Sequence, residues 1–285
     1  MPTSCKDIVG QTGLHLIQPD PATLPFVTYC DMDSTGEGWT LVAAVHENNI
    51  QGKCTVGDKW SSEQEYSSKY LGSKNWENFN VFGDVLDLTW DDYKNVAYHA
   101  LQASNVMLWH VPNALAISEI SDQAYLKYYT NDNVLDQYGG SLRSLYANYA
   151  PLNNAGPSRF YELIVSPIEY IKGSKDTIMA DIPSDEVENV QPGFIQFRAF
   201  DTFGFPQALC PGVKMVTGDS ARICVGGNGA AVGDQIRVPS TRRKVTCGDY
   251  AGWNGKFKDP GLADVPSSSG RSQKYINSSI LIFVK

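Results

Sequence analysis

CDMDSTGEGWTLV, residues Cys30–Val42, is the stretch on which our prediction of the fold depends. Phe26–Tyr29 and Trp39–Val45 are rich in aromatic and β-branched side chains, and they flank a turn that is rich in Asp, Ser and Gly. This pattern predicts two short strands in a hairpin-like arrangement. Asp31–Gly36 imitates the first half of an EF-hand loop, but Val42 stands where the twelfth position needs a bidentate Glu, so we interpret the run as a strand-connecting turn.

Outside this stretch the chain is predicted to be rich in loops. Runs of Gly, Asn, Ser and Pro occupy much of the middle, and we find no internal repeat and no linker. Further strands are predicted at Ala103–His110, Tyr161–Ser166, Gly193–Phe200 and Ile280–Val284, and short helices at Glu63–Leu71, Asp84–Tyr93 and Ser141–Tyr149. Disulfides and bound ions are the usual means of holding so many loops in place.

The composition indicates a folded chain with a substantial core. The 285 residues are 42% apolar and 11% aromatic, enough for one large domain or two intimate ones. The net charge is −8, and Arg242-Arg243-Lys244 is the only tight basic run, so nucleic acid is a poor candidate partner. No apolar run approaches the roughly 18 residues of a membrane-spanning helix, so we expect no membrane insertion. No charged-then-apolar leader follows Met1, and we expect any signal peptide to have been removed.

The cysteines favour an oxidising compartment. They form an even, widely spaced set without a C-x-x-C pair: Cys5, Cys30, Cys54, Cys210, Cys224 and Cys247. Such a set is typical of structural disulfides in a secreted protein, and the alternative is six reduced core thiols in a cytosolic one. Asn277-Ser278-Ser279 is an N-glycosylation pattern and is consistent with secretion.

No catalytic arrangement stands out. Gly227–Gly233 resembles a dinucleotide-binding turn, but no convincing helix follows it and no βαβ pattern surrounds it. His46-Glu47 begins like a zinc-protease helix, yet Ile50 occupies the position of the second His. The histidines are scattered, and we interpret them as packed or backbone-bonded residues: His15, His46, His99 and His110. We therefore predict that the chain is not an enzyme.

Several ordered motifs carry a resemblance to a known family. Cys30-Asp31-Met32 followed by Gly36–Val42 resembles the opening of fibrinogen-related domains. Five further motifs, in order and at similar spacing, resemble the intelectin (X-type lectin) family: Val45–Asn49, Gly52–Ser62, Asp91–Asn95, Trp109–Asn113 and Cys247–Asp249. The similarity runs from about Cys5 to the strand at Ile280–Val284 and so covers nearly the whole chain.

This resemblance implies a fold. It implies an α+β, fibrinogen-like/intelectin fold with twisted antiparallel sheets, short helices, and extensive disulfide- and calcium-stabilised loops. Residues 1–285 would form one intelectin-like domain, with a fibrinogen-related core at about 3–110 and a loop-rich part at about 111–285. The implied disulfides are Cys5–Cys30, Cys54–Cys247 and Cys210–Cys224. No cysteine then remains to link subunits, which leaves only a non-covalent homo-oligomer open.

The resemblance also implies two buried calcium ions. One would be bound by the loop that contains His46, Asn49, Gly52 and Gly57, through carbonyl and amide oxygens. The other would be bound by the carboxylates of Glu47, Asp92 and Asp249, which would repel one another without a cation. The alternative is that these residues only cap turns at the surface.

A third, exposed calcium ion binds the sugar in the family, and here that site is altered. Asp219 and Asp234 offer carboxylates, but Ala221 and Arg222 stand where the family has an acid and a histidine. Loss of an anionic ligand weakens a calcium site, so the third ion is doubtful. Arg222 could contact an anionic ligand, and the aromatic wall would come from Tyr250 or Trp253.

The predicted function is therefore that of a secreted, calcium-binding lectin. It would bind exocyclic diols of glycans on microbial or cell surfaces. The alternative is a structural or protein-binding member of the family that keeps the two structural ions and has lost the ligand-binding one. The Asp219–Cys224 loop is the feature that separates the two hypotheses.

Overall fold

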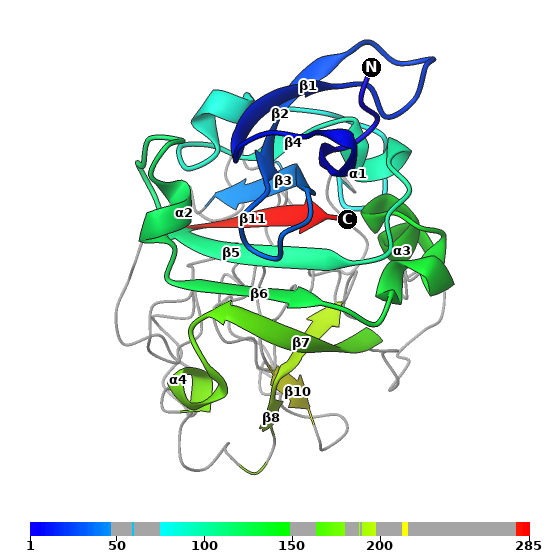
Figure 1. Ribbon diagram of the computed structural model, residues 1–285. Coiled ribbons are helices and arrows are strands. Elements are labelled where there is room, and N and C mark those ends of the chain that lie inside the picture. Colours follow the sequence, from blue (N-terminus) through cyan, green and yellow to red (C-terminus); the bar gives the residue numbers. More distant parts are fainter. Residues whose placement is uncertain are drawn as a thin grey trace, which may run out of the picture.

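The computed structural model describes residues 1–46, 59, 75–148, 164–179, 188, 190–197, 213–215 and 278–285 (Figure 1). Its strands are β1 (Gly13–Ile17), β2 (Phe26–Asp31), β3 (Trp39–His46), β4 (Tyr93–Lys94), β5 (Val106–Pro112), β6 (Leu126–Thr130), β7 (Ile164–Lys172), β8 (Val190–Pro192), β9 (Phe194–Phe197), β10 (Val213–Met215) and β11 (Ser278–Val284). Its helices are α1 (Ala97–Ala100), α2 (Ile120–Gln123), α3 (Leu142–Asn148) and α4 (Lys175–Met179), with 3₁₀ turns η1 (Cys5–Asp7), η2 (Val85–Asp87) and η3 (Val134–Tyr138).

Most of these strands form one antiparallel sheet. Its order is β1-β2-β3-β11-β5-β6-β7-β9, with β4 also paired to β3. The C-terminal strand β11 lies between β3 and β5, where Ile280 is opposite both Val45 and His110. Figure 1 shows β11, in red, in the middle of the sheet. The predicted antiparallel sheet with short helices is thus confirmed, and the sheet takes strands from both sides of residue 110.

The central strands are apolar because both faces of the sheet are covered. Successive residues of β11 belong alternately to two hydrophobic clusters: Ile280 and Ile282 to one, Leu281 and Phe283 to the other. Neighbouring β5 alternates in the same way, with Leu108 on the first side and Trp109 on the second. Since side chains of a strand point to opposite faces in turn, a strand between two cores is apolar at most of its positions.

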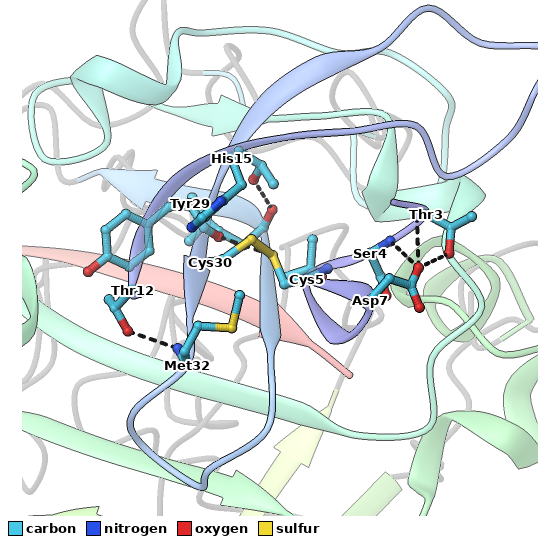
Figure 2. Close-up of a disulfide and its surroundings, with 12 residues drawn as sticks. Thr3, Ser4, Cys5, Asp7, Thr12, His15, Tyr29, Cys30 and Met32 are labelled. Carbon is cyan, nitrogen blue, oxygen red and sulfur yellow. Dashed lines mark hydrogen bonds between the residues drawn. A yellow bond between two sulfur atoms is a disulfide. The ribbon is translucent and has the colours of Figure 1, made fainter. Parts of the chain in front are cut away.

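The chain turns between β2 and β3 within the stretch Cys30–Val42, and the structure explains why glycine stands at two positions of this turn. Gly36 has a φ of +73°, which a residue with a side chain adopts only with strain. A Cβ on Gly38 would lie 2.1 Å from the carbonyl oxygen of Cys5, so only glycine lets the N-terminal segment pack there. Cys5 is bound to Cys30 by a disulfide (Figure 2), as the resemblance implied. The turn and the disulfide together hold the N-terminus against the sheet.

Most of the predicted elements that fall in the described residues are confirmed. The strands at Phe26–Tyr29, Trp39–Val45, Ala103–His110 and Ile280–Val284 correspond to β2, β3, β5 and β11, and the helix at Ser141–Tyr149 to α3. The strands at Tyr161–Ser166 and Gly193–Phe200 overlap β7 and β9. The helix at Glu63–Leu71 lies outside the described residues. No helix within the described ranges is long and apolar enough to cross a membrane.

The helix predicted at Asp84–Tyr93 is wrong. Only Val85–Asp87 forms a 3₁₀ turn, which Asp84 caps by accepting a hydrogen bond from the backbone N–H of Leu86 at 2.9 Å. Tyr93 then pairs with Ala44 of β3 as the first residue of β4. Pairing with a buried strand therefore overrides the local helical preference of an acidic, cap-like sequence.

Candidate functional site

The structure describes two of the seven predicted calcium ligands, His46 and Asp92. The other five, Glu47, Asn49, Gly52, Gly57 and Asp249, lie outside the described residues. The same holds for the predicted ligand-binding residues Asp219, Arg222, Asp234, Tyr250 and Trp253. It also holds for Cys54, Cys210, Cys224 and Cys247, so two of the three implied disulfides stay predictions.

Asp92 is positioned by the pairing of β4 with β3. Because Tyr93 is opposite Ala44, the residue before β4 comes to the end of β3, where His46 lies. Oδ1 of Asp92 accepts a hydrogen bond from the backbone N–H of His46 at 2.8 Å. Oδ2 accepts one from the backbone N–H of Lys59 at 2.9 Å. The Asp92 side chain, which is 2% exposed, therefore binds both residues that flank the segment 47–58.

The surroundings of Asp92 are built tightly around it. Gly83 has a φ of +78°, and a Cβ there would lie 2.2 Å from the carbonyl oxygen of Asp92. Only glycine therefore permits the turn before η2 to pack on this residue. The backbone N–H of Asp92 donates to Oδ1 of Asp91 at 2.7 Å. This bond fixes the backbone of Asp92, and the two N–H groups that donate to its carboxylate fix the side chain.

This arrangement is compatible with a calcium ligand at Asp92. Each carboxylate oxygen accepts a hydrogen bond from a backbone N–H. Carboxylate oxygens are also the kind of ligand that Ca²⁺ prefers. His46 fits less directly, because calcium is bound by oxygen and only the backbone carbonyl of this residue could serve. The structure therefore brings together two residues that the resemblance assigned to different ions.

Replacing Asp92 by asparagine is expected to lower the free energy of unfolding by about 2 kcal/mol, measured by urea denaturation in the presence of a chelator. The amide offers one acceptor and one donor, so its NH₂ group must face a backbone N–H that is left without an acceptor. Asp87→Asn makes the same change on an exposed side chain and is expected to shift the stability by less than about 0.5 kcal/mol. Equal effects of the two changes would contradict the role given to Asp92.

A second cluster, which the sequence analysis did not single out, lies between α1 and α3. Lys94 is buried, and its Nζ donates to the carbonyl oxygen of Asn78 at 2.9 Å. Burial, followed by the charge of Arg143, lowers the pKa of Lys94 to about 7. The pKa of His99 is lowered by burial first and then by Lys94 and Arg143. Arg143 lies far from the other two residues in the sequence, so no spacing indicates that the three meet.

The comparisons with known proteins match only part of the chain. Residues 2–89 match the family model of the C-terminal globular domain of fibrinogen beta and gamma chains. A stretch of 60 residues, 20% of the chain, is 38% identical to the fibrinogen beta chain of Gallus gallus and covers 12% of that protein. A stretch of 65 residues, 21% of the chain, is 31% identical to the fibrinogen gamma chain of Rattus norvegicus and covers 14% of it.

The matched segment contains the Cys5–Cys30 disulfide and the turn at Gly36–Gly38. The predicted resemblance to fibrinogen-related domains is therefore supported over residues 2–89. The match ends at residue 89, before Asp92 and before three of the five motifs that resemble intelectins. The intelectin part of the prediction has no support from these comparisons and is taken up as a proposal below.

Proposed function

We propose that this chain is a secreted, non-catalytic recognition domain of the intelectin kind, which binds glycans through calcium. Asp92 carries the proposal. Its buried carboxylate binds the backbone of His46 and of Lys59, and the segment between them contains four of the predicted calcium ligands. A carboxylate that is fixed to the residues on both sides of this segment suits a loop that folds around a cation.

The glycan would bind at the exposed ion. Two vicinal hydroxyls of an exocyclic diol replace water on calcium, and the protein supplies the other oxygens. Asp219 and Asp234 are the proposed carboxylate ligands, with Tyr250 or Trp253 against the apolar face of the sugar. The match to the fibrinogen-type domain and the Cys5–Cys30 disulfide favour an extracellular recognition module over a cytosolic protein.

The test is binding of the full chain to an array of microbial and host glycans, with calcium and with a chelator. We expect binding to glycans with terminal vicinal diols, lost both on chelation and after mild periodate oxidation of the same glycans, which cleaves the diol. Asp219→Ala and Asp234→Ala are expected to reduce binding at least about tenfold, because each removes a charged ligand. Thermal melting in the chelator shows whether the fold is intact when binding is lost.

The second candidate is a structural or protein-binding role with the structural ions alone. Ala221 and Arg222, which stand in place of an acid and a histidine, favour it because a cation next to the site repels calcium. A chain that calcium stabilises against thermal unfolding but that binds no glycan on the array would support this candidate. Chelator-sensitive binding would exclude it.

A further inference from the structure

Phe79, His99 and Arg143 form a group that neither the calcium sites nor the core requires. Phe79 lies in the segment before β4 and is 61% exposed. The guanidinium carbon of Arg143 in α3 lies 3.8 Å from the centre of its ring. The imidazole of His99 in α1 meets the same ring edge-on, with the ring centres 5.1 Å apart. Helices α1 and α3 pack together on one side of the sheet (Figure 1).

The segment that carries Phe79 is held firmly by its neighbours. Oδ1 of Asn75 accepts hydrogen bonds from the amides of Asn78 at 2.9 Å and Asn80 at 3.2 Å. Lys94 donates to the carbonyl of Asn78, as described above. Full burial of a Phe side chain contributes about 2 kcal/mol, yet this network fixes the ring in solvent. A single exposed apolar residue needs no explanation. An exposed ring that contacts both a guanidinium and an imidazole does.

Two nitrogens beside the ring have no hydrogen-bond partner. Nε of Arg143 and Nδ1 of His99 are buried and have no hydrogen-bond partner. In the part of the chain that the structure describes, the Arg143 guanidinium makes no ion pair and no hydrogen bond, and its contact is the Phe79 ring. The charged neighbours that act on His99 are the cations Lys94 and Arg143. Because Nε of Arg143 is buried, the atoms left for an incoming anion are the two Nη groups, which are not among the buried nitrogens.

We propose that Phe79, His99 and Arg143 form a calcium-independent subsite for a sugar that carries a carboxylate, as a hexuronate does. The planar guanidinium of Arg143 matches a carboxylate through hydrogen bonds from its two Nη groups, and His99 offers Nε2, since its Nδ1 is buried. The exposed side of Phe79 is an apolar surface on which the C–H face of a pyranose ring packs. The inference rests on the proposed function in one respect, namely that the chain recognises glycans.

The experiment is calorimetric titration of the full chain, in a chelator, with methyl glucuronide and with methyl glucoside, which has the same ring and no charge. We expect the glucuronide to bind and the glucoside to bind at least about tenfold more weakly, the factor that a charge-assisted bidentate pair provides. Arg143→Gln and Phe79→Leu are expected to weaken glucuronide binding at least about tenfold. Arg143→Lys keeps the charge but loses the planar pair of donors, so its affinity for the glucuronide is expected to lie between those of the wild type and Arg143→Gln. Lys6→Gln removes an exposed charge elsewhere and serves as the matched control.

Three outcomes would overturn the proposal. They are equal affinity for the two glycosides, equal affinity for acetate and the glucuronide, and a loss with Lys6→Gln as large as with Arg143→Gln. Should Arg143→Gln fail to fold, Phe79→Leu gives the same decision, because its side chain is exposed. A failure of this proposal can be told apart from a failure of the proposed calcium-dependent glycan binding. Arg143→Gln leaves chelator-sensitive diol binding intact in our proposal, while Asp219→Ala leaves glucuronide binding intact.

Discussion

Replacing Cys5 and Cys30 together by alanine is expected to lower the free energy of unfolding by about 3 kcal/mol, measured by urea denaturation. The disulfide closes a loop with a sequence separation of 25, and such a link removes conformational freedom from the unfolded chain. Alanine is preferred to serine because both cysteines are fully buried, and a buried hydroxyl would add a cost of its own. Mutation also leaves the other four cysteines untouched, which a reducing agent would not.

The control separates the covalent link from the local structure of the N-terminus. Oδ2 of Asp7 accepts a hydrogen bond from the backbone N–H of Thr3 at 2.8 Å and from that of Ser4 at 3.2 Å (Figure 2). Asp7→Ala removes this cap at the surface and is expected to cost less than about 1 kcal/mol. If Asp7→Ala destabilises the chain as much as the loss of both cysteines, the disulfide adds little beyond holding the N-terminal turn.

The hairpin and the central strands could be predicted because their signals are local. Gly36 and Gly38 mark a turn between two apolar runs, and β-branched and aromatic residues fill β2, β3 and β11. β1 was not predicted, because Leu14 and Leu16 are half-exposed on an edge strand and alternate weakly with polar residues. The position of β11 between β3 and β5 also has no local signal. It depends on pairings across more than 160 residues.

At the candidate site, too, the type of residue could be predicted from the sequence but its contacts could not. Asp92 was predicted as a ligand of a buried calcium ion; the structure places the residue in the interior, and the ion stays a prediction. Its partners, however, are backbone N–H groups of residues 46 and 59, and a backbone donor looks the same at every position in a sequence. Phe79, His99 and Arg143 were missed for a related reason. They meet only because α1 packs on α3, and none of the three belongs to a motif.

His110 shows how a motif residue can belong to the core. It lies in the run Trp109–Asn113, which resembles the intelectin family, and the structure places it fully buried in β5. Its Nε2 lies 3.0 Å from the hydroxyl of Tyr128 in β6. The interpretation of His110 as a packed residue is thereby confirmed. Its place in the motif is explained by packing between two strands.

The burial of His110 is expected to make the protein sensitive to acid. Burial lowers the pKa of His110 to about 3 in the folded chain, whereas an unfolded chain has a pKa of about 6.5. Between these values the unfolded state binds a proton that the folded state does not, so stability is full above pH 6.5 and falls as the pH falls. From pH 7.5 to pH 5 this residue alone is expected to cost about 2 kcal/mol.

Urea denaturation of the wild type and of His110→Gln at pH 7.5, 6 and 5 measures this effect. Glutamine does not titrate. As the pH is lowered from 7.5 to 5, the free energy of unfolding of the variant is therefore expected to rise by about 2 kcal/mol relative to that of the wild type. Tyr128→Phe removes the hydrogen bond but leaves the imidazole buried, and it should lower stability by a similar amount at each pH because burial, not the hydroxyl, depresses the pKa of His110. If the profile of His110→Gln runs parallel to that of the wild type, the imidazole takes up a proton in the folded chain and the β5–β6 core must admit water at that position.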